Sequence, residues 1–306
     1  MIKSYSICPQ AAGKYISSLY GTKKNIWIGT DEGIYIYAYA TETFTYFDLT
    51  TPNNVRITSI VNHILQDKDG NLWFSTNGQG LFRYNLSKNY LEQYEFTSAF
   101  GIVASTMADS DNQIWALTNQ GESGVYKLNK AENKFEPFGL LYNAGNHHSQ
   151  ALAMLEDSEQ TLWLGTWECG LQKIDKYTRQ TTTYLHPTDG KGVTHIHSLM
   201  EYAPHQLLIG SDDGLLLFNT LTEEYKLFTE NETVPNSLSN RFVYPIIKDR
   251  EGGIWIGTYY GGINYISPNA EQFESFSHSR LYNSINGNVI GRFCDCLLYT
   301  SDAADD

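Results

Sequence analysis

The sequence lacks the features of several large classes of protein. No apolar run is long enough to span a membrane, and the first ten residues, MIKSYSICPQ, contain neither the apolar core nor the cleavage pattern of an export signal. Lysine and arginine total 21 against 34 aspartates and glutamates, a net charge of −13. The field of such a chain repels polyanions, and no local basic patch is visible, so we expect no nucleic-acid partner.

The residues that usually carry chemistry are also scarce. The four cysteines build neither a disulfide framework nor a CxxC zinc site, and the phosphate-loop, nucleophile-elbow and HExxH motifs are missing. Histidine clusters only at His147-His148 and at His195-x-His197, and neither cluster has a patterned partner. His195 and His197 alternate along a predicted strand and share a face, which we interpret as a packed or solvated pair. We therefore expect no metal and no cofactor.

Acidic turns beginning at Asp67, Asp109 and Asp157 raise the question of calcium. An EF-hand loop that starts at Asp67 needs Gly at its sixth position and Glu at its twelfth, where this chain has Leu72 and Gly78. Tight turns select Asp, Asn and Gly, so we predict that these segments are turns between the first and second strands of a repeat.

What the sequence does contain is a repeat centred on tryptophan. In DKDGNLWFSTNGQGLFRYN, residues 67–85, an Asp/Gly/Asn turn precedes an apolar run around Trp73, and a Gly turn precedes a second run, as in a β-hairpin. The pattern recurs every 42 to 48 residues, once with leucine at the tryptophan position. We expect the large repeated rings to pack between neighbouring repeats. The anchors are Trp27, Trp73, Trp115, Trp163, Leu208 and Trp255.

A period of this length with four short strands and no helical pattern predicts an all-β fold, a β-propeller with six four-stranded blades. Two remnants, a last strand at 1–9 and a first strand at 285–295, predict further, incomplete blades. Residues 296–306, CLLYTSDAADD, break the repeat and resemble a translated transposon-end sequencing adapter, so we expect a non-native tail. The blades are predicted at 14–50, 55–98, 101–140, 148–187, 193–230 and 240–278.

The repeats, written D-x-x-G-x-[LI]-W-[IF]-G-T-x-x-G-[LI]-x-x-[YF]-[DN], resemble the two-component regulator propeller repeat, most clearly in EGGIWIGTYYGGINYISP at 251–268. The resemblance covers Lys14 to Asp295, and it implies that the six blades and the remnants are part of a seven-bladed propeller. It implies the periplasmic sensor region of a hybrid two-component system of gut Bacteroidetes, whose histidine kinase and membrane span are absent from this sequence. It also implies a homodimeric parent protein that recognises oligosaccharides released from complex glycans.

Antiparallel order places the turn between the second and third strands on the same rim as the connection to the next blade, and we expect the ligand there. Sugar rings stack on Trp and Tyr, while Asp, Asn, His and Arg bind hydroxyl groups. Trp167 is the most informative candidate, because it lies outside the repeated tryptophan position. The candidate ligand-binding residues are Trp167, Glu168, Tyr259, Tyr260, His147, His148, Asp212 and Arg241.

Two other functions stay open. A scaffold propeller would mediate dimerisation and signal relay without a ligand of its own. A propeller glycosidase or lyase is the third possibility, and a glycosidase needs two carboxylates about 5 to 10 Å apart across a cleft. Glu32, Glu168 and Asp213 are candidates, but they occupy similar turns in different repeats, as any acidic loop residue would. We therefore expect no enzymatic activity in this chain.

Overall fold

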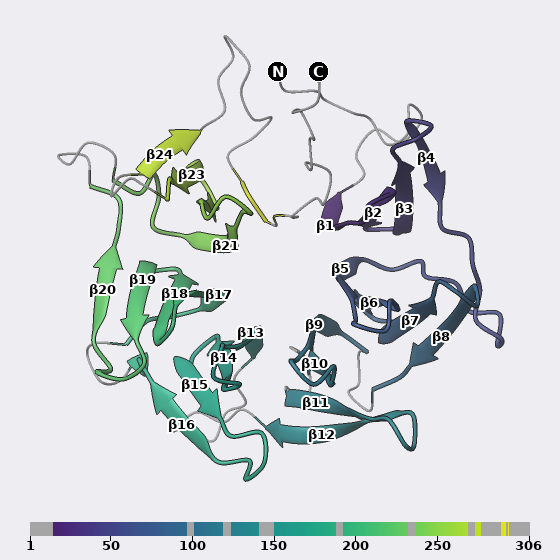
Figure 1. Cartoon of the computed structure of the whole chain (residues 1–306), viewed down its shortest axis with the longest axis horizontal. Coiled ribbons are helices and arrows are strands. Elements are labelled where there is room, and N and C mark those ends of the chain that lie inside the picture. Colours follow the sequence, from purple (N-terminus) through teal and green to yellow (C-terminus); the bar gives the residue numbers. More distant parts are fainter. Residues whose placement is uncertain are drawn as a thin grey trace, which may run out of the picture. The chain divides into compact units, whose positions relative to one another are not determined.

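A computed structural model describes residues 15–96, 101–118, 124–140, 150–187, 192–231, 237–268, 273–276, 289–291 and 293. Within these ranges the chain forms six four-stranded antiparallel sheets, which confirms the predicted all-β fold and its four-stranded blades (Figure 1). None of the described residues forms a helix that is long and apolar enough to cross a membrane. The predicted segments at 1–9 and 296–306 lie outside the described residues.

Each sheet follows the chain order of its strands, so each blade is an up-and-down meander. The first two blades are β1 (Ile16–Gly21) to β4 (Thr43–Tyr46), through β2 (Asn25–Thr30) and β3 (Gly33–Ala38), and β5 (Val61–Gln66) to β8 (Tyr90–Tyr94), through β6 (Leu72–Thr76) and β7 (Leu81–Asn85). The third contains β9 (Val103–Ala108), β10 (Ile114–Thr118), β11 (Gly124–Asn129) and β12 (Lys134–Leu140).

The last three blades follow the same order. The fourth contains β13 (Ala151–Glu156), β14 (Leu162–Thr166), β15 (Leu171–Ile174) and β16 (Thr181–Tyr184). The fifth contains β17 (Ile196–Ala203), β18 (Gln206–Ser211), β19 (Gly214–Asn219) and β20 (Tyr225–Phe228). The sixth contains β21 (Val243–Lys248), β22 (Ile254–Thr258), β23 (Gly262–Ile266) and β24 (Phe273–Phe276).

The chain divides into two compact units, here called the N-terminal unit (residues 3–108) and the C-terminal unit (residues 109–293). In the N-terminal unit β1 packs against β5, and β5 against β9; in the C-terminal unit β13 packs against β17, and β17 against β21. First strands of consecutive blades therefore lie next to one another within each unit. Stacking of this kind buries sheet faces that a single blade leaves exposed.

The repeated tryptophans are tied to the first turn of their blades. Trp73 Nε1 donates to Asp67 Oδ2 at 2.8 Å, and Asp67 Oδ1 accepts the backbone N–H groups of Asp69 and Asn71 at 3.0 and 2.8 Å. The acidic turns are thus structural, as predicted, because both carboxylate oxygens are used within the blade. The equivalent indole-to-carboxylate bonds join Trp115 to Asp109 at 2.9 Å, Trp163 to Asp157 at 2.7 Å and Trp255 to Asp249 at 2.9 Å.

The first blade lacks this arrangement. Its turn closes with a bond from Thr22 N to Asn25 O, whereas the second blade bonds Asp67 N to Asn71 O across one more residue. Among the described residues no carboxylate reaches Trp27, and its buried indole N–H finds no hydrogen-bond partner. The ring still packs against the next blade, with its centroid 5.8 Å from that of Phe74. Packing alone therefore holds Trp27.

A buried hydroxyl fixes the turn that follows each second strand. Thr166 Oγ1 donates to Gly170 O at 2.7 Å and accepts from Cys169 N at 2.9 Å. The preceding Gly165 leaves no room for a Cβ, which would lie 2.4 Å from Ile196 of the next blade. Hence the G-T pair of the repeat serves close blade packing and turn closure, and the residue that follows it starts the exposed turn. The equivalent fully buried hydroxyls belong to Thr30, Thr76, Thr118, Ser211 and Thr258.

Candidate functional site

In the C-terminal unit, seven side chains form a continuous cluster at the turns after β14, β18 and β22 and at the starts of β17 and β21. We call it the rim cluster. It contains one carboxylate among six aromatic or imidazole rings, drawn from three consecutive blades. Its members are Trp167, His195, His197, Asp212, Tyr244, Tyr259 and Tyr260.

Asp212 lies at the centre of the cluster between two histidines. Its Oδ1 lies 2.8 Å from His197 Nε2, and its Oδ2 contacts His195 Nδ1. The backbone makes this arrangement possible. His195 has a positive φ of 49°, which turns the chain just before β17, and the register shifts between Ile196 and Ser198, so that His197 lies in a β-bulge. Bulges re-aim side chains, and here one carboxylate receives both rings.

The rings extend from this centre in two directions. On one side Trp167 packs on His195, with centroids 3.9 Å apart. On the other side His197 stacks on Tyr244 at 4.0 Å and an interplanar angle of 12°, and Tyr244 lies 5.2 Å from Tyr259.

Tyr260 completes the cluster. Its ring centroid lies 4.6 Å from that of Tyr259. The exposed ends of the cluster are aromatic: Trp167, Tyr259 and Tyr260 are 39%, 37% and 61% exposed.

Burial sets the protonation of the centre. It lowers the pKa of His197 below its ordinary value, and the hydrogen bond and charge of Asp212 oppose this effect only in part. A neutral His197 that donates its Nε2 proton to Asp212 keeps a lone pair on Nδ1. Burial, and then the charge of Asp212, raise the pKa of Tyr244, which therefore remains a neutral phenol. The cluster carries a carboxylate whose oxygens are already ordered.

The structure brings together four of the residues predicted from the sequence: Trp167, Asp212, Tyr259 and Tyr260. Glu168 is exposed in the same turn as Trp167. Arg241 is exposed beside one end of the cluster, since its guanidinium lies 4.9 Å from the centroid of Phe242, whose ring is 6.2 Å from that of Tyr260. His147 and His148 lie outside the described residues.

Sequence reasoning missed the roles of His195, His197 and Tyr244. The interpretation of His195-x-His197 as a packed or solvated pair was incomplete, because both rings bond to the rim residue Asp212. Aligning the repeats would have given a signal, since His197 and Tyr244 each follow the first buried residue of a first strand. The bulge that turns these positions toward the cluster arises from strand pairing, which the repeat pattern does not mark.

One of the three carboxylates considered for a glycosidase, Asp213, has a structural role, and its neighbour Asp212 belongs to the rim cluster. Asp213 Oδ2 accepts the backbone N–H of Thr194 at 2.8 Å and its hydroxyl at 3.0 Å, which fixes the segment before β17. Asp212 is shared by the two histidines. Among the described residues no three His, Cys, Asp or Glu side chains are grouped so that they could hold a metal ion.

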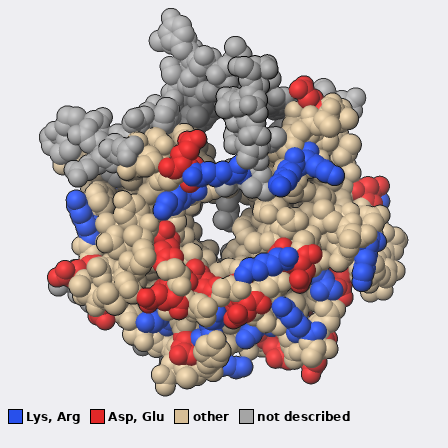
Figure 2. All heavy atoms as spheres, in the orientation of Figure 1, with Lys and Arg blue, Asp and Glu red and all other residues tan. Residues whose placement is uncertain are grey.

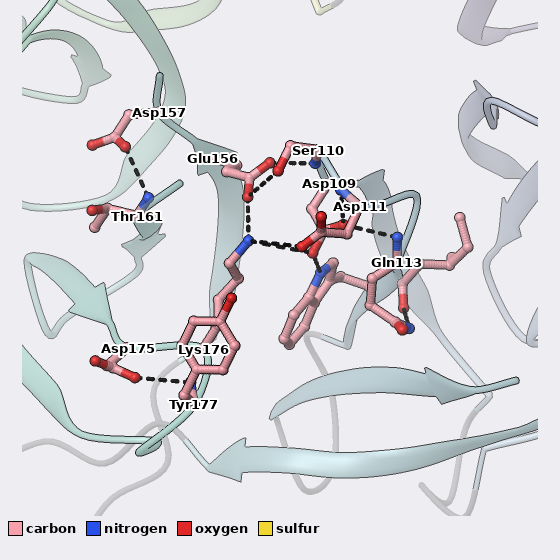
Figure 3. Close-up of polar contacts among 12 residues, drawn as sticks. Asp109, Ser110, Asp111, Gln113, Glu156, Asp157, Thr161, Asp175, Lys176 and Tyr177 are labelled. Atoms are coloured by element: carbon pink, nitrogen blue, oxygen red, sulfur yellow. Dashed lines mark hydrogen bonds and ion pairs between the residues drawn. The ribbon is translucent and has the colours of Figure 1, made fainter. Parts of the chain in front are cut away.

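A second polar cluster, around Lys176, lies in the same unit (Figure 3). The buried ammonium group pairs with Glu156 and lies 3.7 Å from Asp109 Oδ2 and 4.0 Å from Asp111 Oδ2. Burial lowers the pKa of Lys176, but Glu156 and Asp109 outweigh it, so the pKa is raised. A lysine held charged in this way is a poor base or nucleophile. The cluster instead joins the turn after β9 to the turn after β15.

Charge elsewhere is mixed. On the face drawn in Figure 2, acidic and basic side chains are interspersed among uncharged residues. Net charge does not set the rim cluster apart from the rest of the surface. Its exposed rings and its ordered carboxylate do.

Known proteins contain the same kind of repeat. The model of the two-component regulator propeller matches residues 55–78 and 237–260, which contain β5 and β6 and the strands β21 and β22. Histidine kinase P4 of Formosa agariphila is 29% identical over 229 residues, which cover 71% of this chain and 16% of that protein. The chain thus spans about a sixth of the length of this relative.

Solved structures show the same fold. The extracellular domain of BT4673 from B. thetaiotaomicron, described as a one component or hybrid two component system, has a TM-score of 0.68 at 24% identity over 86% of this chain and 33% of its own. That of BT3049, described as a hybrid two component system of the same organism, has a TM-score of 0.71 at 19% identity, over 91% of this chain and 37% of its own.

An enzyme shares the architecture as well. Virginiamycin B lyase from Staphylococcus aureus, in a catalytically inactive H270A form, has a TM-score of 0.65 at 17% identity over 86% of this chain and 84% of its own. Such a likeness concerns the fold alone. The resemblance inferred from the repeats is confirmed: two segments of the chain match the two-component regulator propeller, and its fold is similar to that of extracellular domains of putative two-component systems.

Proposed function

We propose that this chain is part of the ligand-sensing propeller of an extracytoplasmic two-component sensor and that it binds glycan-derived oligosaccharides at the rim cluster. The observation that carries the proposal is the run of rings from Trp167 to Tyr260, exposed at both ends and built around Asp212. Aromatic faces are apolar surfaces that suit the CH faces of sugar rings. Carboxylate and imidazole groups bind hydroxyl groups by hydrogen bonds.

The geometry gives each group a role. Trp167 at one end and Tyr260 at the other stack sugar rings. Asp212 and His195, which are only partly buried, bind the hydroxyl groups between them. The two histidines hold the carboxylate in place, so little ordering remains to be done when the ligand binds.

Signalling follows from the placement of the cluster on three blades. A ligand that touches the turns after β14 and β22 and the start of β17 links these blades, and its binding energy favours one arrangement of them. We propose that a homodimeric, periplasmic parent protein passes this change to a histidine kinase. The chain itself is proposed to have no catalytic activity.

Calorimetric titration of the chain with a panel of neutral and acidic oligosaccharides tests the proposal. Trp167→Ala and Tyr260→Ala are expected to weaken binding by tenfold or more. Tyr177→Ala is the matched control, because Tyr177 lies outside the cluster and is 82% exposed. This variant should bind the oligosaccharide with the affinity of the unaltered chain. Unchanged affinity in the rim variants would favour the scaffold function, and silence toward every glycan would refute ligand sensing.

A second candidate function, a lyase, is favoured by two observations. Neutral His197 oriented by Asp212 resembles a general base, and the related fold of the lyase described above loses activity in its H270A form. Uronate-containing oligosaccharides incubated with the chain would then give an unsaturated product that absorbs ultraviolet light. If the unaltered chain forms this product and the His197→Gln variant does not, catalysis would replace sensing as the proposed function.

A further inference from the structure

The C-terminal unit contains a hollow on the flank between the third and fourth blades, apart from the rim cluster. Its volume is about 320 Å³, near the lower end of the range for small-molecule sites. Figure 1 shows the β15–β16 turn beside β12, where the hollow lies. The charged side chains that line it are Lys127, Lys130, Arg179 and Glu136.

The three cations of this hollow have no ion-pair partner among the described residues. Lys127 Nζ lies over the ring of Trp115, 5.2 Å from its centroid, and Arg179 lies over Phe138 at 5.1 Å. Of the described residues in the lining, Glu136 is the one acidic side chain, and its Oε1 accepts a hydrogen bond from Asn129 Nδ2 at 2.8 Å. Three positive charges and one negative charge leave the hollow cationic, in a chain whose net charge is −13.

Strand pairing and a closed turn fix the backbone positions of Lys127 and Arg179. Lys127 is directly opposite Trp115 on β10 and opposite Glu136 on β12. Arg179 has a φ of 62°, and its N–H donates to Asp175 O at 3.0 Å. Asp175 also accepts the N–H groups of Tyr177 and Thr178 at 2.8 and 2.7 Å, so the turn that carries Arg179 is closed by several bonds.

We infer that this hollow binds a small molecule bearing a sulfate, phosphate or carboxylate group. Guanidinium and ammonium groups bind oxyanions. The side chains of Leu128, Pro137 and Phe138 add an apolar surface for the carrier of the charge. The hollow is larger than a bare oxyanion, which leaves room for a carrier of about the size of a monosaccharide. The inference is independent of the proposed function of the rim cluster.

The experiment is a titration of the full chain at constant ionic strength with inorganic sulfate, glucose 6-phosphate and glucose. The first two should bind, and glucose should not. If glucose 6-phosphate binds more tightly than inorganic sulfate, the ligand is an anionic group attached to a carrier. If the two bind equally, the ligand is a free anion. Lys127→Gln combined with Arg179→Gln should weaken the binding of both anions at least tenfold.

The fourth blade supplies a matched control. Lys173 is opposite Trp163 as Lys127 is opposite Trp115, and it lies over that ring at 5.8 Å, but it does not line the hollow. Lys173→Gln should therefore keep the affinity of the unaltered chain, as should Trp167→Ala in the rim cluster. Lys130→Gln, at an exposed position, should weaken anion binding several-fold without any effect on folding.

Three results would overturn the inference. They are absence of anion binding to the unaltered chain, equal binding of glucose, and an equal loss of affinity in Lys173→Gln and Lys127→Gln.

Discussion

Two tryptophans four residues apart in the fourth blade have opposite environments. Trp163 is 1% exposed, donates its indole N–H to Asp157 and packs on Phe218 of the next blade. Trp167 is 39% exposed and packs on His195 in the rim cluster. The first belongs to the repeat and the second does not. A position shared by all blades therefore serves the scaffold, and a large side chain outside the shared positions marks the candidate site.

The largest expected effect is on the scaffold tryptophan. Trp163→Ala should reduce the free energy of unfolding by about 3–5 kcal/mol, because it leaves a cavity between blades and removes the partner of Asp157. Trp167→Ala should cost less than about 1 kcal/mol, as is usual for partly exposed sites. Denaturant unfolding of both variants measures the difference. Equal destabilisation would break the distinction between the two positions.

A second pair of tryptophans sharpens the comparison within the scaffold. Trp73→Phe removes a buried hydrogen bond to the Asp67 carboxylate. It should reduce the free energy of unfolding by about 1.5–3 kcal/mol more than the loss of buried ring area alone would. Trp27→Phe removes an indole N–H that has no partner, so it should cost only the lost area. The unfolding midpoint should therefore fall further in Trp73→Phe than in Trp27→Phe. A larger fall in Trp27→Phe would contradict the role given to the acidic turn.

The smallest expected effect is on pH dependence at the rim. Because burial lowers the pKa of His197 below its ordinary 6.5, protonation favours the unfolded chain. The stability from neutral His197 is therefore complete above pH 6.5 and is lost as the pH falls toward the lowered value, by at most about 1.4 kcal/mol per pH unit. His197→Gln should flatten this part of the stability profile. An unchanged slope between the two proteins would show that His197 does not titrate in this way.

The scaffold could be predicted from the sequence, because its determinants are local. Trp73 and Asp67 are six residues apart and bond within one blade, and the G-T pair at 165–166 acts on its own turn and on the next blade. Repetition then gave the blades and their strands. The turn chemistry was also correct, since Asp67 bonds to the backbone of its own turn.

The rim cluster could be predicted only in part. Trp167, Asp212, Tyr259 and Tyr260 were found because turns after second strands share one edge of the blades. His197 and Tyr244 were not, because their side chains reach the cluster through bulges in β17 and β21, and the bulges depend on strand register. A bulge places an extra residue in one strand of a pair, and the repeat pattern, which marks the strands, does not show where that residue lies.

The most direct test of the account uses the indole N–H signals of the six tryptophans in a nitrogen–proton correlation spectrum. A bound oligosaccharide is expected to shift the signal of Trp167. The four indole signals from rings bonded to carboxylates should stay in place, namely those of Trp73, Trp115, Trp163 and Trp255. Trp167→Phe assigns the shifted signal by its loss. A ligand that shifted the carboxylate-bonded signals and left that of Trp167 unchanged would contradict the separation of scaffold from site.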